Sequence, residues 1–178
     1  EAISALDAGA PSRLGEGFVV PTLRGVLDAL PAGVLDIELK VTTDHATCAP
    51  TDREATVSLL LEDVANFPRE RLVVSSFDAE ILRLVRAADP TITIALIASR
   101  TDAIATAETE GFDAVALLFL VVNEDVIADA HARGLDIWVW TLDSRELAES
   151  LLLAGVDAII TDAVPVVRDA RARVVPGT

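Results

Sequence analysis

The stretch Val34-Leu35-Asp36-Ile37-Glu38-Leu39-Lys40-Val41 alternates strictly between apolar and charged side chains. In an extended chain its four apolar residues share one face and its three charged residues share the other. This period of two predicts a β-strand whose apolar face packs against other elements.

Further strand-like runs follow at regular intervals. Together with the first they begin near Val34, Leu72, Thr91, Ala114, Leu135 and Val156. After the first interval each unit takes about twenty residues, the length of one strand and one helix. Strands that are joined only by crossover helices run parallel, so the chain is predicted to be a βα series.

The segments between these runs carry helix signals. Val57, Leu60, Leu61 and Val64 have the spacing of one helix face. Asp78 and Ser144 stand where helices should begin, and Gly111, Gly134 and Gly155 where helices should end. A short helix is expected around residues 23–30 and a last one over residues 164–174.

A series of this kind forms either a doubly wound sheet or a closed barrel. No strand is followed by the glycine-rich phosphate loop of dinucleotide folds, which favours a TIM-type (βα) barrel. A complete barrel has eight units in about 250 residues, so this one is predicted to be incomplete. We expect a single α/β domain over residues 1–178, with an entry loop and short helix in 1–33 and six βα units in 34–178.

The charged face of the first strand is the most informative feature for function. In a barrel the apolar face meets the helices, so Asp36, Glu38 and Lys40 are predicted to point inward. Glu38 and Lys40 lie toward the carboxyl end of the strand, where barrel enzymes have their sites. The alternative is a buried ion pair that only fills the interior.

An ordered set of motifs resembles the glycerophosphodiester phosphodiesterase family. The set comprises Leu6-Asp7-Ala8-Gly9, Val20-Pro21-Thr22-Leu23 followed by Val26-Leu27, Ile37-Glu38-Leu39-Lys40, Ser76-Phe77, Trp140-Thr141 and the run from Gly155 to Asp162. The resemblance covers essentially the whole chain.

The resemblance implies hydrolysis of glycerophosphodiesters to glycerol 3-phosphate and an alcohol. It implies a divalent metal, calcium or magnesium, with Glu38 as one ligand, and it places Lys40 beside the phosphate as a catalytic and substrate-binding residue. Trp140, and Phe77 as its companion, would form an aromatic wall for the substrate. For both aromatics the alternative is packing inside the barrel, which is the role expected of Trp138.

The family's opening His-Arg-Gly strand, its Glu-x-Asp metal strand and its His-Asp segment have no counterpart in residues 1–178. We therefore interpret the chain as strands three to eight of a barrel, and we expect it to be inactive by itself. His131 is interpreted as a helix residue and His45 as a loop residue, and neither replaces a catalytic histidine. Asp162 is predicted to cap the last helix.

Composition limits the partners. The formal charge is −15, which argues against nucleic acid as a partner. Thirteen of the fourteen basic residues are arginine, a balance that resembles salt-adapted proteins. The uncharged run from Ala114 to Asn123 is too short for stable membrane insertion. We expect a cytoplasmic rather than a secreted enzyme. No leader is visible, because the amino terminus is interpreted as missing. The sequence does not define the oligomeric state.

Two other functions fit part of this pattern. A related barrel phospholipase would act on lipid phosphodiesters, but it should carry a basic or apolar patch for docking on a membrane. A non-catalytic barrel would keep the pocket and lack the chemistry. The sequence upstream of Glu1 would discriminate between the two. An enzyme should carry the family's opening motifs there, and a non-catalytic barrel should lack them.

Overall fold

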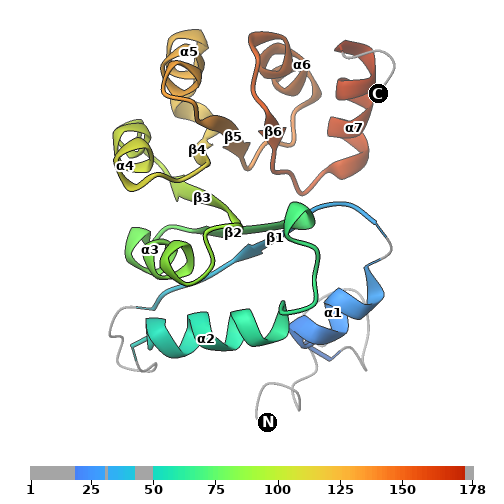
Figure 1. Cartoon of the computed structure of the whole chain (residues 1–178). Helices are drawn as coiled ribbons and strands as arrows, with labels where there is room; N and C mark the ends of the chain where they lie inside the picture. Colours follow the sequence, from blue (N-terminus) through green and yellow to red (C-terminus); the bar gives the residue numbers. More distant parts are fainter. Residues whose placement is uncertain (1–18, 31, 43–49, 175–178) are drawn as a thin grey trace.

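The computed structural model describes residues 19–30, 32–42 and 50–174. Its centre is one sheet of six strands, in which each strand pairs in parallel with the next along the chain. The strands are β1 (Leu35–Glu38), β2 (Leu72–Ser76), β3 (Thr93–Ala98), β4 (Ala114–Leu118), β5 (Asp136–Trp140) and β6 (Ala158–Ile159). The sheet is curled, and helices follow its outer side (Figure 1).

One helix follows each strand, and one precedes the first. The helices are α1 (Leu23–Ala29), α2 (Arg53–Asp63), α3 (Ala79–Ala88), α4 (Ala103–Glu110), α5 (Glu124–Ala132), α6 (Arg145–Ala154) and α7 (Val164–Val174). Two short 3-10 turns, η2 (Arg69–Arg71) and η3 (Phe119–Val121), precede β2 and follow β4. The architecture is therefore a half-barrel built from βα units, as the periodicity predicts.

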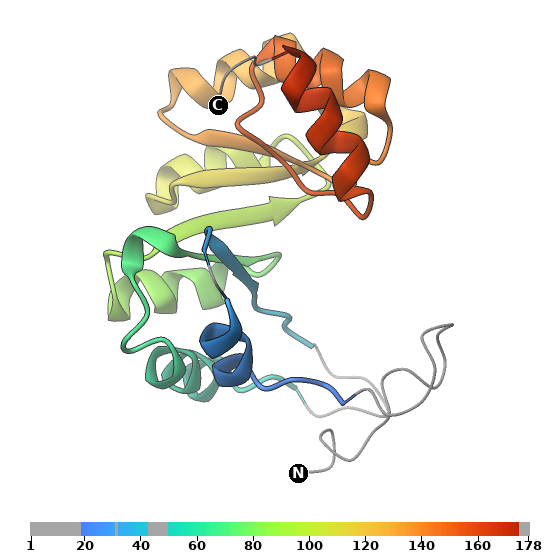
Figure 2. The same cartoon turned by 90° about the vertical axis from the view of Figure 1, so that its right-hand side faces the viewer.

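The main core lies between the sheet and the helices. Alternate residues of the strands face this layer, and they include Val74, Ile94, Val115 and Ile137, none of which is exposed. The intervening residues face the concave side of the curl, which is seen from another direction in Figure 2. There Val73, Ala95 and Ala114 form a small buried cluster, against which Trp138 packs. Trp138 thus has the filling role expected of it.

The predicted helix ends agree with the structure. The Asp78 carboxylate accepts a hydrogen bond from the amide of Ile81, and the Ser144 hydroxyl accepts one from the amide of Leu147. Gly111 and Gly155 end α4 and α6 with φ angles of 67° and 103°, a conformation that costs glycine little.

Two expectations about the first strand need correction. The ladder of β1 ends at Glu38, so Lys40 lies just beyond the strand. Asp36 and Glu38 face the concave side of the sheet, as expected, but this side is exposed rather than enclosed because the described strands form only part of a barrel. These carboxylates therefore keep contact with solvent in the described half-barrel.

None of the described helices is long and apolar enough to cross a membrane.

The outer core predicts that two substitutions of an apolar residue by alanine differ greatly in their effect on the free energy of unfolding. Ile137 is fully buried on β5, whereas Leu153 on α6 is 73% exposed. Ile137→Ala should lower the free energy of unfolding by about 2–5 kcal/mol because it leaves a cavity, and Leu153→Ala should change it by less than about 0.5 kcal/mol. Urea unfolding followed by circular dichroism measures both, and equal losses would contradict the assignment of faces.

Candidate active site at the carboxyl ends of the strands

Glu38 and Lys40 lie together at the end of β1. The Lys40 Nζ is 3.7 Å from the Glu38 Oε1, and the two side chains are 81% and 35% exposed. They line a cavity of about 400 Å³ with Leu39, Val41, Phe77 and Asp78. The cavity therefore offers a cation, a carboxylate and an aromatic ring within one space.

Phe77 and Trp140 meet although they come from strands that are not neighbours. Their ring centroids are 5.4 Å apart and the planes are nearly perpendicular, at 84°. Phe77 directly follows β2, and Trp140 is the last residue of β5. The Trp140 Nε1 donates to the carbonyl of Ala116 at 2.9 Å, which fixes the indole over β4. The curl of the sheet thus brings the ends of β2 and β5 together at one mouth.

Two polar groups lie deeper on the same face as Glu38. Removal of water around the Asp36 carboxyl raises its pKa, and the nearby charge of Glu38 raises it further. Ser75 is paired in register with Glu38 and is 1% exposed. Its hydroxyl lies next to the Asp36 carboxyl and partly offsets the effect of burial on the pKa of that group. The base of the mouth therefore contains a carboxyl group with a raised pKa and a buried hydroxyl group beside it.

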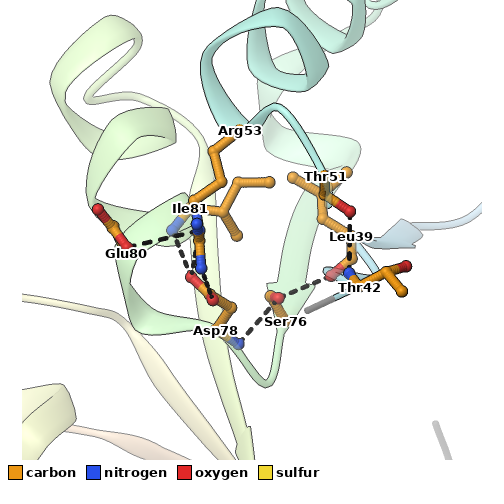
Figure 3. A network of polar contacts seen from close by, with 8 residues as sticks. All are labelled: Leu39, Thr42, Thr51, Arg53, Ser76, Asp78, Glu80 and Ile81. Atoms are coloured by element: carbon orange, nitrogen blue, oxygen red, sulfur yellow. Dashed lines mark hydrogen bonds and ion pairs between the residues drawn. The ribbon is translucent and has the colours of Figure 1, made fainter. Parts of the chain in front are cut away.

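Hydrogen bonds connect the start of α2 to the turn after β2 (Figure 3). Arg53 binds the Asp78 carboxylate through two nitrogens, at 3.2 and 2.6 Å. The Ser76 hydroxyl accepts from the amide of Asp78 at 3.0 Å and donates to the carbonyl of Leu39 at 2.7 Å. The Arg53 guanidinium lowers the pKa of Asp78, and the amide of Ile81 adds to this effect.

A second set of bonds lies beyond Trp140. The Asp143 Oδ1 accepts from the Thr161 hydroxyl at 2.8 Å and from the amides of Asp162 and Ala163 at 2.9 and 3.2 Å. These bonds lower the pKa of Asp143, and the bond from Thr161 has the largest effect. Asp162 does not stand at the predicted cap position, because α7 begins at Val164 and Ala163 directly precedes it. The Asp143 carboxylate binds the two amides before the helix.

The structure brings the predicted site residues together. Glu38, Lys40 and Phe77 share one cavity, and Phe77 joins it to Trp140. Phe77 is 57% exposed, so it is a mouth residue and not a core residue.

The histidines do not join this group. His131, near the end of α5, binds Asp157 at 2.9 Å just before β6 begins, at the opposite end of the sheet. His45 lies outside the described residues.

Sequence reasoning missed Arg53 and Asp143. The partner of Arg53 is 25 residues away, and those of Asp143 are 18 to 20 residues away. No local spacing rule connects such pairs. The run Ser76-Phe77-Asp78 was the available signal, since it places two hydrogen-bonding residues on either side of an exposed ring.

The described residues provide only part of a cation site. Glu38 is an accessible carboxylate of the kind that calcium and magnesium prefer. In residues 19–30, 32–42 and 50–174, however, no group of three or more His, Cys, Asp or Glu side chains is arranged to bind a metal ion. A hard divalent cation would need further oxygen ligands.

Comparison with known proteins assigns the family. The model of the glycerophosphoryl diester phosphodiesterase family matches residues 3–166. The chain belongs to this family. A Mycobacterium tuberculosis relative, named "Probable glycerophosphodiester phosphodiesterase 2", is 31% identical over 89% of the chain. A glycerophosphodiester phosphodiesterase from Caldanaerobacter subterraneus is 29% identical over 91% of it. The chain spans 62% and 66% of the lengths of these two relatives.

Solved structures of other proteins share the fold. A Silicibacter pomeroyi protein, named "Putative glycerophosphoryl diester phosphodiesterase", superposes with a TM-score of 0.76 at 26% identity, covering 87% of this chain and 57% of that one. A phosphodiesterase from Oleispira antarctica, in complex with the product sn-glycerol-3-phosphate, gives a TM-score of 0.72 at 21% identity, with 85% and 61% covered. The half-barrel thus corresponds to part of the fold of these two proteins.

The Arg53–Asp78 contact predicts an acid-dependent loss of stability. The pKa of folded Asp78 lies below its usual value of 3.8, so the contact contributes fully above about pH 4 and is lost as the pH falls through the folded pKa. Asp78→Asn keeps the helix cap but removes the charge, and should cost about 2 kcal/mol at pH 7.

Urea unfolding between pH 2 and pH 7 measures this difference. The variant and the wild type should converge at the acid end, and a constant difference at every pH would contradict the prediction. Asp102→Asn is the control because its pair with Arg100 is 67% and 78% exposed and should contribute little.

Proposed function

We propose that the chain forms part of an enzyme that hydrolyses glycerophosphodiesters to glycerol 3-phosphate and an alcohol. The cavity that unites Lys40 with Glu38 and Phe77 carries this proposal. It lies at the carboxyl ends of parallel strands, where barrel enzymes bind their substrates. Family membership, and the glycerol 3-phosphate in the Oleispira antarctica enzyme, support the same substrate class.

Lys40 is the proposed contact for the phosphoryl group. Its ammonium is accessible at the mouth, and the nearby Glu38 carboxylate restrains it without burying it. An ammonium in this position attracts the phosphodiester anion and stabilises the charge that develops on the phosphoryl oxygens during hydrolysis.

Phe77 and Trp140 are the proposed walls for the uncharged part of the substrate. Their rings meet at nearly a right angle, and the Phe77 ring lines the cavity that contains Lys40. The carbon atoms of a glycerol unit or a choline-like head group would be more stable against these two rings than in bulk water. The phosphate would therefore bind at Lys40 with its organic substituent against the rings.

We propose that hydrolysis depends on calcium or magnesium and that Glu38 provides one carboxylate ligand. Such an ion would supply positive charge next to the phosphoryl group. The remaining ligands, and the acid and base for proton transfer, would come from groups other than the described residues. Completion by two further strand–helix units would make β1 to β6 strands three to eight of an eight-unit barrel. Residues 1–178 alone should then be inactive.

Release of glycerol 3-phosphate from glycerophosphocholine tests this function. A protein that carries residues 1–178 within a complete barrel should release it, and a chelator should abolish the release until calcium or magnesium is restored. Residues 1–178 alone should release none, because the part of the chain that the structure describes has no group of three or more side chains arranged to hold a hard cation. Activity that resists the chelator would require another mechanism.

Substitutions at the mouth should separate the two charged groups. Glu38→Gln should lower kcat/KM by about 100-fold or more and weaken calcium binding in calorimetry, since it removes a carboxylate ligand. Lys40→Ala should lower kcat/KM by about 100-fold while calcium binding persists, because the ammonium acts on the phosphate. Glu110→Gln, which breaks an outer pair with Arg83, is the control and should change neither. Full activity of Glu38→Gln would contradict the assigned role.

A further inference from the structure

The turn that carries Phe77 is fixed by a half-buried ion pair (Figure 3). Arg53, the first residue of α2, donates from two nitrogens to the two carboxylate oxygens of Asp78. Its Nε also lies 3.5 Å from the Glu80 carboxylate. The Arg53 and Asp78 side chains are 27% and 22% exposed. A two-bond contact shielded in this way is stronger and more directional than an exposed pair.

The same turn is tied to the end of β1. The fully buried Ser76 hydroxyl connects the amide of Asp78 to the carbonyl of Leu39. Leu39 lies between the two charged residues of the mouth. A continuous series of bonds therefore runs from Arg53 to the backbone between Glu38 and Lys40.

Phe77 stands between the two residues that this network fixes. Its ring is largely exposed, so core packing does not hold it, and its aromatic contact is with Trp140. The backbone at Phe77 cannot shift without breaking the bonds of Ser76 or Asp78. The position of the ring thus depends on the hydrogen bonds that Ser76 and Asp78 make on either side of it.

We propose that Arg53 is a positioning residue of the mouth. Through Asp78 it sets the Phe77 ring against Trp140 and keeps the end of β1 beside that ring. Arg53 does not line the cavity with Lys40, so it acts through the turn and not on the substrate. The kinetic consequence of this role rests on the proposed function, whereas the structural consequence can be measured without it.

Tryptophan spectroscopy tests the structural part. The chain has two tryptophans and no tyrosine, so Trp138→Phe leaves Trp140 as the dominant near-UV chromophore. In this background Phe77→Leu gives the reference signal for a lost aromatic contact. Arg53→Gln should move the near-UV circular dichroism of Trp140 toward that reference.

Arg69→Gln is the matched control. Arg69 binds Asp89 at 2.8 Å, the two side chains are 28% and 17% exposed, and the pair lies at the opposite end of α3. Arg69 also donates to the carbonyls of Val64 and Phe67. Its removal should therefore cost at least as much stability as that of Arg53 and leave the Trp140 signal unchanged. An Arg53→Gln spectrum equal to that of Arg69→Gln would overturn the proposal.

Ser76 gives an independent variant should Arg53→Gln fail to fold. Ser76→Ala removes both bonds of the hydroxyl, and Ser76→Thr restores them. The alanine variant should shift the Trp140 signal and the threonine variant should recover it. A folded alanine variant with the wild-type signal would overturn the proposal.

Kinetics test the consequence for the substrate in the complete, active enzyme. Arg53→Gln should raise KM for glycerophosphocholine about 10-fold with kcat changed less than about twofold, as expected for lost positioning of a binding wall. Arg69→Gln should change neither constant. An unchanged KM in Arg53→Gln would overturn the kinetic role. If the wild-type enzyme does not hydrolyse this substrate, the proposed function fails, and the spectroscopic comparison decides the positioning role separately.

Discussion

Parallel pairing between consecutive strands is the constraint on which the rest of this molecule depends. Each crossover returns the chain to the same end of the sheet, so every strand finishes at the same rim. The register also decides which residues meet there. Glu38 lies opposite Ser75 in the ladder of β1 and β2, and two residues further along each chain Lys40 and Phe77 line one cavity.

The two faces of the curled sheet have separate tasks. The outer face buries large aliphatic side chains under the helices and provides most of the stability. The concave face has a base of small residues such as Ala95 and Ala114, which leave room for Trp138 above them and for polar groups at the rim. Because stability comes from the outer layer, charged groups such as Asp36 and Glu38 can face the concave side without opening the core.

Sequence periodicity predicts the features that depend on neighbouring residues. The strands and helices, the caps at Asp78 and Ser144, and the charged face of β1 all follow from local spacing. Phe77 and Trp140, which the family motifs include, lie directly after β2 and at the end of β5. The contact between these rings, and the pair of Arg53 with Asp78, could not be predicted because they depend on the curvature of the sheet and on partners far apart in the chain.

The solitary lysine has a practical consequence for labelling chemistry. Apart from the terminal amine, Lys40 is the only primary amine in the chain, and 81% of its side chain is open to solvent. A reagent that acylates or reductively alkylates amines would therefore modify the mouth and leave the thirteen arginines untouched. A fluorophore attached there would lie in the same cavity as Phe77, so that its emission could report directly what enters the mouth.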